Sequence, residues 1–108
     1  MRINISKDYT DTPGGRYICE GEFSGEDFRN TLLEPKFLES KNNNEKLTID
    51  FDDTYGYSDS FLEEAFGGLA RKYTTNVVNN ILQFISNDEP SLIKKVEDYI
   101  RNCNMKRN

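Results

Sequence analysis

Residues 46–69 read KLTIDFDDTYGYSDSFLEEAFGGL, and this stretch decides the fold of the chain. Its first six residues place apolar side chains at every second position, which predicts a strand over residues 46–51. A loop follows over residues 52–59, and Ser60 with Glu63 forms a capping box that opens a helix. The apolar stripe of that helix consists of Phe61, Leu62, Ala65, Phe66, Leu69 and Tyr73. A Gly-Gly pair at residues 67–68 lowers helix propensity, so we expect the helix backbone to approach the sheet closely there.

Further strands are predicted on both sides of this stretch, over residues 2–6, 16–23 and 80–86. A helix is expected to begin after the capping residue Ser24, and Pro35 predicts a kink or a break in it. The order ββαβαβα indicates an α/β domain with a small, partly parallel sheet of about four strands and helices packed against it.

The end of the chain is predicted to form a last helix over residues 88–102, with Pro90 in its first turn. A polar tail follows at residues 104–108. We see no linker and no repeat, so residues 1–108 are expected to form one domain.

The composition excludes several kinds of function. The chain has 108 residues with 19 acidic and 14 basic side chains, so its formal net charge is −5. The excess lies entirely in residues 1–54, which carry 12 acidic and 7 basic side chains. An acidic chain is poorly suited to bind phosphate backbones, so we expect no nucleic acid partner. The chain contains no His, the usual general base and metal ligand, and we expect neither catalysis nor a metal nor a cofactor.

The cysteines and the hydropathy predict a cytoplasmic protein. Cys19 and Cys103 are far apart and lack CxxC spacing, which is typical of reduced thiols. No stretch approaches the roughly 18–20 apolar residues of a membrane span. The first nine residues also lack the apolar core of a signal peptide. We therefore expect no membrane partner.

A D-x-D-x-T motif directly follows the central strand, at Asp50, Asp52 and Thr54. It resembles the first motif of haloacid-dehalogenase-type phosphotransferases, in which the first Asp attacks phosphorus and the second is the acid/base, with Mg²⁺ between them. That family also needs a later Lys and a second acidic pair, and Asp88 with Glu89 is the only later pair at a strand end. A Mg²⁺-dependent phosphotransferase is therefore the third hypothesis, and the simpler interpretation is that these acids turn the loop in solvent.

Glycine-rich turns offer a second candidate site, for a small ligand or nucleotide. Turns of this kind and a helix N-terminus bind anions through backbone N–H groups. The chain has no complete nucleotide fingerprint, so turn chemistry alone also explains the pattern. The candidate residues are Gly14, Gly15, Arg16, Ser24, Gly25 and Glu26.

Hydroxyl groups gather at the start of the second helix, where Ser58 and Ser60 flank Asp59. A helix N-terminus favours added negative charge, so either Ser is a candidate phosphorylation site. The alternative is that Ser60 only caps the helix, with Glu63 and Glu64 favouring the helix dipole.

The segments at residues 13–16, 23–29 and 56–69 together resemble the STAS-like domain family of unknown function, over about residues 12–99. The resemblance implies the fold of bacterial anti-sigma-factor antagonists, in which a histidine-kinase-like ATPase phosphorylates a Ser and so breaks their complex. That phosphoacceptor position falls on Asp59, which forms no stable phosphate ester. Asp59 would then mimic the phosphorylated state, or Ser58 would take the role.

The leading hypothesis is a non-enzymatic regulatory module of a bacterial signalling pathway, which binds a protein partner such as a histidine-kinase-like ATPase. Its binding face would comprise the loop at residues 52–59, the start of the second helix and the loop at residues 13–16. Tyrosines make good interface anchors, and the acidic excess favours a partner with a basic surface. The partner-binding candidates are Tyr55, Tyr57, Asp52, Asp53, Glu63 and Glu64. The oligomeric state stays open.

Overall fold

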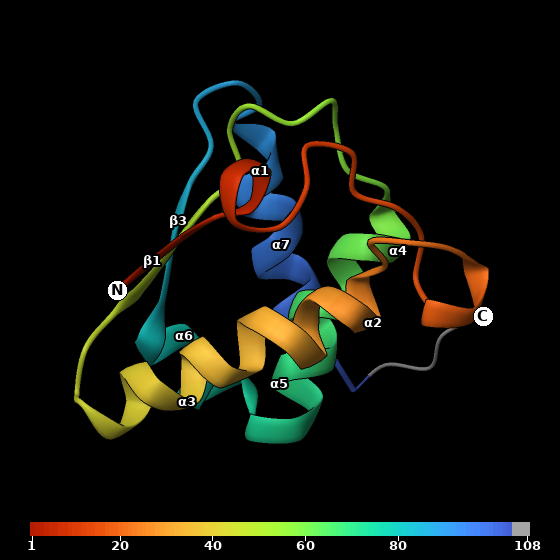
Figure 1. The fold of residues 1–108 in the computed structure, drawn as a ribbon. Helices are drawn as coiled ribbons and strands as arrows, with labels where there is room; N and C mark the ends of the chain where they lie inside the picture. The colour runs from red at the N-terminus through yellow and green to blue at the C-terminus, as the bar shows by residue number, and fades with distance from the viewer. Residues whose placement is uncertain (105–108) are drawn as a thin grey trace.

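The structure is a computed structural model that describes residues 1–104 (Figure 1). Its three strands are β1 (Arg2–Asn4), β2 (Leu47–Asp50) and β3 (Leu82–Ile85). The helical segments are α1 (Ile5–Asp8), η1 (Ile18–Glu20), α2 (Gly25–Phe28), η2 (Arg29–Leu33), α3 (Glu34–Asn42), α4 (Asp59–Leu62), η3 (Glu63–Gly67), α5 (Gly68–Tyr73), α6 (Thr75–Ile81) and α7 (Ser91–Arg101). Most of the predicted polar tail, residues 105–108, lies outside the described residues.

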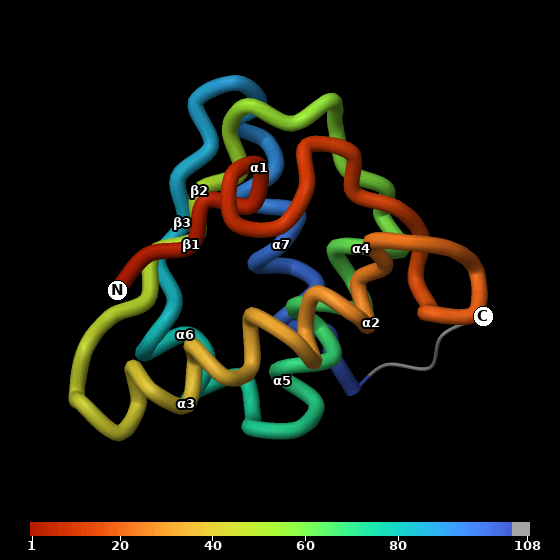
Figure 2. The backbone as a smooth tube through the Cα atoms, viewed as in Figure 1, coloured from red at the N-terminus to blue at the C-terminus, as the bar shows by residue number. Residues whose placement is uncertain are grey.

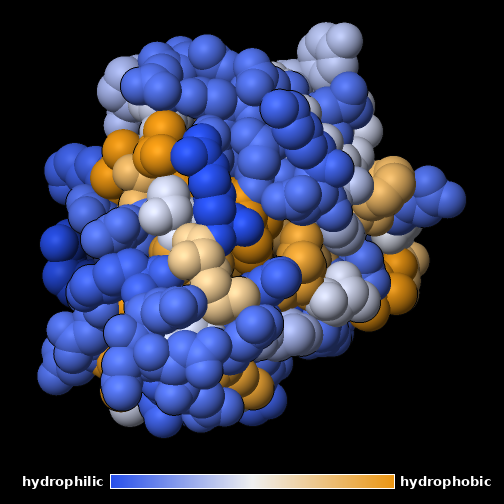
Figure 3. All heavy atoms as spheres, turned by 60° about the vertical axis from the view of Figure 1, so that its left-hand side comes forward, coloured by the Kyte–Doolittle hydropathy of each residue, from blue (hydrophilic) through white to orange (hydrophobic). Residues whose placement is uncertain are grey.

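The sheet is parallel throughout, in the order β1-β2-β3, and it has one covered and one open face. The helices lie on one side of it (Figure 1, Figure 2), and the row Ile3, Ile49 and Phe84 faces them. The neighbouring row on the other face is polar and consists of Arg2, Thr48 and Gln83. The side of the molecule turned forward in Figure 3 is accordingly mostly hydrophilic. Parallel sheets are usually covered on both faces, so the open face departs from the common arrangement.

The predicted strand over residues 16–23 is wrong, and the sheet has three strands in place of about four. This segment is a loop that contains the short 3₁₀ turn η1. The Glu20 carboxylate accepts hydrogen bonds from the backbone N–H groups of Arg16, at 3.1 Å, and Tyr17, at 2.8 Å. These bonds close a turn that an extended strand would open. Ile18, which lies in this segment, is 52% exposed.

The predicted interruption at Pro35 is replaced by a π turn. The chain runs helically from α2 through η2 into α3, and η2 ends two residues before Pro35. Proline has no N–H to donate to the carbonyl one turn earlier, and the wider π turn changes the hydrogen-bond register at this point.

A second helical run joins α4, η3 and α5, and it too contains a π turn, at η3. A separate helix, α6, follows this run, and no helix is predicted from the sequence at these residues. Thr74 separates the two helices with φ of 78°, and its Oγ1 accepts a hydrogen bond from Val77 N at 3.4 Å. The order ββαβαβα therefore does not hold in detail, although the α/β class does.

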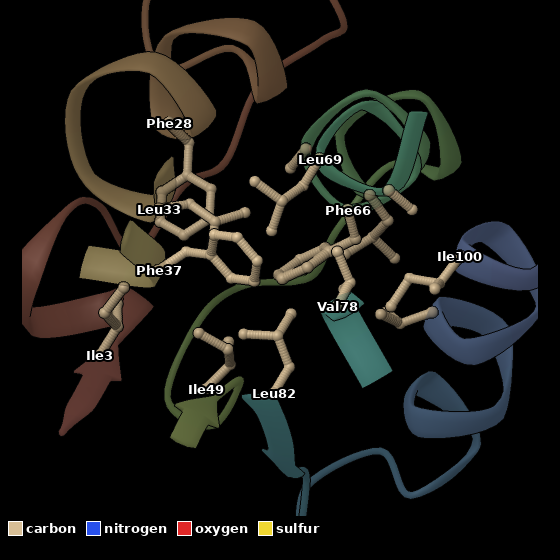
Figure 4. Close-up of a cluster of buried hydrophobic side chains, with 14 of the residues drawn as sticks. Ile3, Phe28, Leu33, Phe37, Ile49, Phe66, Leu69, Val78, Leu82 and Ile100 are labelled. Carbon is tan, nitrogen blue, oxygen red and sulfur yellow. The ribbon is translucent and has the colours of Figure 1, made fainter. Parts of the chain in front are cut away.

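The core lies between the covered sheet face and the helices, as Figure 4 shows. Phe66 on η3 is its central ring, with ring centroids at 6.2 Å from Phe28, 5.6 Å from Phe51 and 5.9 Å from Phe84. Burial of each such side chain contributes about 1.5–3 kcal/mol. The η3 turn is thereby fixed against both the sheet and the first helical run.

Two further observations concern the predicted environment. No helix within residues 1–104 is both long and apolar enough to cross a membrane. Both cysteines are free thiols, Cys19 exposed and Cys103 buried.

Candidate functional site

The loop at residues 13–16 covers the start of α2. The carbonyl of Gly15 accepts a hydrogen bond from Gly25 N at 2.9 Å, and that of Arg16 accepts one from Glu26 N at 3.0 Å. The Ser24 hydroxyl caps the next N–H of the helix. The first N–H groups of α2 are thus used by the loop and by the cap, and the ligand-binding hypothesis gains no support from them.

The start of α4 lies beside that of α2 and is capped by Ser58. Its Oγ accepts a hydrogen bond from Phe61 N at 3.0 Å and donates one to the Gly14 carbonyl at 2.9 Å. The predicted cap at Ser60 is therefore wrong, because the helix begins one residue before it, at Asp59. Gly25 permits the close approach, since a Cβ there would overlap the Phe61 carbonyl.

The three phosphorylation candidates differ in their surroundings. Ser58 is exposed and bridges α4 to the loop. Asp59 is exposed and pairs with Lys95 at 3.1 Å, a surface ion pair of small energetic weight. Burial, and after it the negative charge of Asp59, raises the pKa of the Tyr99 hydroxyl. Ser60 is partly buried within the first turn of the helix.

Beneath the loop lies a group of five charged side chains, which we call the arginine–glutamate cluster: Arg16, Arg29, Arg71, Glu63 and Glu64. Arg16 binds Glu63 and lies 3.4 Å from Glu64, Arg29 binds Glu64 at 2.7 Å, and Arg71 binds Glu63 at 2.6 Å. Arg29 also donates to the Glu64 carbonyl, and Arg71 to the Cys103 carbonyl at 3.1 Å. The cluster joins the loop, both helical runs and the end of the described chain.

Burial and charge oppose each other in this cluster. Between 8% and 24% of each of its side chains is exposed. Burial alone would raise the pKa of Glu63, but hydrogen bonds from Arg71 and Arg16 outweigh it and hold that pKa below its usual value. Three guanidinium groups and two carboxylates leave one positive unit of charge. Breaking such a buried pair leaves an uncompensated charge, so all its members depend on one another.

The Gly-Gly pair in this helical run makes room for the cluster. A Cβ on Gly68 would overlap the Arg29 guanidinium, and one on Gly67 would lie 2.7 Å from the Glu63 carboxylate. The expected approach of this backbone to the sheet is therefore wrong, because arginine and glutamate side chains lie against the two glycines. Arg29 and Arg71 are not among the site candidates predicted from the sequence. The Gly-Gly pair is the one sequence feature that is connected to them, because it leaves room for side chains of the cluster.

The acidic residues after β2 form hydrogen bonds with the loop that follows β3. Asp52 accepts hydrogen bonds from the backbone N of Asn87 at 2.7 Å and of Asp88 at 2.9 Å. Asp53, with φ of 72°, donates its own N–H to the Asp88 carboxylate at 2.9 Å and is exposed. These bonds tie the loop after β2 to the loop after β3.

Asp50 lies apart from this arrangement. It is buried, pairs with Arg2 at 2.6 Å and accepts a hydrogen bond from Asp52 N at 3.0 Å. Burial would raise its pKa, and these two bonds lower it below the usual range. Asp50 and Asp52 thus have separate partners, and residues 1–104 contain no group of three or more His, Cys, Asp or Glu side chains able to hold a metal ion. The phosphotransferase hypothesis gains no support from this geometry.

The two tyrosine candidates have different roles. Tyr55 is 87% exposed, and its backbone N–H holds the Asp11 carbonyl at 2.9 Å. Tyr57 is half-buried, packs edge-on against Phe51 and donates its hydroxyl to the Phe51 carbonyl at 2.9 Å. Burial also raises the pKa of the Tyr57 hydroxyl. Of these two tyrosines, Tyr55 therefore has the exposed ring.

The comparisons with known proteins place this arrangement in a family. No curated protein and no solved structure matches the chain. A family model described as a STAS-like domain of unknown function matches residues 24–92, which run from the cap of α2 to the start of α7. The matched segment includes both helix starts and four of the five residues of the arginine–glutamate cluster. The chain therefore belongs to the STAS-like domain family of unknown function.

Proposed function

We propose that this chain is a non-enzymatic regulatory module that works by binding a protein partner in the cytoplasm, and that Ser58 is its switch. Membership of the STAS-like family fits a regulatory module. The observation that carries the proposal is the position of Ser58, an exposed residue whose hydroxyl joins the start of α4 to the loop at residues 13–16.

Phosphorylation of Ser58 would break this connection. A kinase-type partner transfers the γ-phosphoryl group of ATP to Ser58 Oγ, which loses its proton to a base of the kinase while ADP leaves. The hydroxyl then has no hydrogen to donate to the Gly14 carbonyl. Phosphate oxygens repel a carbonyl oxygen but are stabilised at a helix start. The modification therefore favours α4 and releases the loop.

The partner-binding face is formed by exposed side chains around Ser58. Tyr55 supplies a large aromatic anchor, and Asp53 and Asp59 supply negative charge. With a net charge of −5 on the chain, this face suits a partner with a basic surface. Asp52, Tyr57, Glu63 and Glu64 support the face from within, because their polar groups bind other parts of the chain.

Affinity purification from the native host tests the proposal, with tagged wild type, Ser58→Ala, Ser58→Glu and Tyr55→Ala. Ser60→Ala, two residues along the chain from Ser58, is the matched control. We expect one partner to be recovered with wild type, Ser58→Ala and Ser60→Ala. Recovery should fall about tenfold or more with Ser58→Glu and Tyr55→Ala, which corresponds to about 1.4 kcal/mol of binding energy. Intact mass should show a phosphate on wild type that Ser58→Ala lacks.

Two results would contradict the proposal. One is equal recovery of the partner with all five proteins. The other is phosphate on the Ser58→Ala protein, which would place the modification elsewhere. Thermal unfolding of each purified variant ensures that a loss of recovery reflects the surface and not the fold.

A further inference from the structure

The two edges of the sheet are protected to different degrees. β1 is three residues long and carries the charged Arg2. The N–H of Asn4 donates to the Asp8 carboxylate at 2.8 Å, which occupies the outer side of this edge. A short, charged and internally bonded edge resists pairing with another strand.

β3 is one residue longer than β1 and, in the described part of the chain, lacks both the charge and the internal bond. Phe51 N donates to the Ile85 carbonyl at 2.9 Å, so the peptide groups of Ile85 face β2. Peptide groups of successive strand residues point in opposite directions, which directs the N–H and C=O of Phe84 and the C=O of Leu82 away from the sheet. Within residues 1–104 no hydrogen bond outside the ladder reaches the Phe84 peptide groups. The strand itself, Leu82–Ile85, contains no charge and no proline.

A groove of about 460 Å³ runs along this edge between β3 and α7. Leu82, Phe84 and Ile93 provide its apolar part, and Glu97 and Arg101 lie on its charged part. Arg101 is paired with Asp98. The Glu97 carboxylate is exposed and has neither an ion pair nor a hydrogen bond within the described chain.

We propose that an extended segment of a partner protein adds to the β3 edge as a fourth strand. Its backbone would bond to the outward peptide groups of Leu82 and Phe84, as in other cases of strand addition. One apolar side chain would enter the groove over Phe84 and Ile93, and a Lys or Arg would lie beside Glu97. Among the described residues, Glu97 is the unpaired charge in the lining of the groove, since Arg101 is paired with Asp98, and it therefore favours a basic side chain on the added segment. This inference rests on the proposed function only in requiring a protein partner, and it names a surface separate from Ser58.

Selection of displayed random hexapeptides against the full chain tests the inference. We expect the selected peptides to alternate apolar and other residues, to carry Lys or Arg, and to lack proline. Bound peptide should slow hydrogen exchange of the Phe84 amide. Glu97→Lys should weaken binding about tenfold or more, and a peptide with Glu in place of its Lys should recover it. Glu45→Lys, an equal charge change outside the groove, is the control and should have no effect.

Three outcomes would overturn the inference. They are the failure to select any peptide, selected peptides that leave the Phe84 amide unprotected, and binding that is insensitive to Glu97→Lys. Protection of the Phe84 amide by the protein's own dimerisation at high concentration would also overturn it, since a second copy would then occupy the edge. A partner that is recovered in a Ser58-dependent manner but ignores the β3 edge would contradict only this inference. Peptide binding at β3 with no effect of Ser58→Glu would contradict only the switch.

Discussion

Ser24 and Ser58 cap the two helical runs that meet beneath the loop at residues 13–16, and they do so with almost the same local geometry. Their φ and ψ angles are −73° and 162° for Ser24, and −76° and 151° for Ser58. Each hydroxyl accepts a hydrogen bond at 3.0 Å from the N–H three residues later. Yet Ser24 is 1% exposed, whereas Ser58 is exposed.

The difference arises from what covers each helix start. Two loop carbonyls, those of Gly15 and Arg16, bond to the first N–H groups of α2 and cover Ser24. At α4 the contact runs the other way, because the Ser58 hydroxyl reaches out to the Gly14 carbonyl. Equivalent caps can therefore differ in accessibility: Ser24 is buried, whereas Ser58 is exposed, as the proposed switch requires.

The largest expected effect comes from separating the two helical runs. Glu64→Ala removes the carboxylate that binds Arg29 across them, and it leaves buried guanidinium groups uncompensated. We expect a loss of about 3–5 kcal/mol in the free energy of unfolding, measured by urea denaturation. Glu39→Ala, an exposed site on α3, is the control and should stay within about 0.5 kcal/mol of wild type. A loss below about 1 kcal/mol for Glu64→Ala would show that the cluster does not join the runs.

A direct comparison of the caps has a smaller expected effect. Ser24→Ala should cost about 1–2 kcal/mol, because the freed N–H of Asp27 lies near a buried site where water does not replace the lost bond. Ser58→Ala should cost less, about 0.5–1 kcal/mol, since water can reach its exposed helix start. Denaturant midpoints of the two variants measure the difference. Equal costs, or a larger cost for Ser58→Ala, would contradict the assignment of separate roles.

The smallest expected effect is the contribution of Glu63, which lies in the arginine–glutamate cluster, to the pH dependence of the free energy of unfolding. Its pKa is lower in the folded protein than in the unfolded chain, where a Glu titrates at about 4.3. Its stabilisation is therefore complete above that value and is lost as the pH falls through the folded pKa. Unfolding free energies measured from about pH 7 downward should fall less steeply for Glu63→Gln than for wild type below about pH 4.3. Identical slopes would show that Glu63 has no lowered pKa.

The strongest sequence patterns gave the most reliable predictions. The strand at residues 46–51 and the apolar stripe from Phe61 to Tyr73 are both present, as β2 and as the run from α4 to α5. The predicted strand at residues 16–23 failed because the Glu20 carboxylate bonds to the backbone before it. The helix start was placed two residues late because Ser58 and Ser60 are equivalent in the sequence, and only contact with Gly14 distinguishes them.

The sequence by itself determined the class of the fold, its family and the segment in which the candidate switch lies. Periodicity and capping patterns are local, so they can be recognised without knowledge of distant contacts. The tertiary structure decided which serine is exposed, how Arg29 and Arg71 meet the glutamates, and which sheet edge remains open. Each of these depends on residues that lie far apart in the chain, and only folding brings their charges and peptide groups within bonding distance.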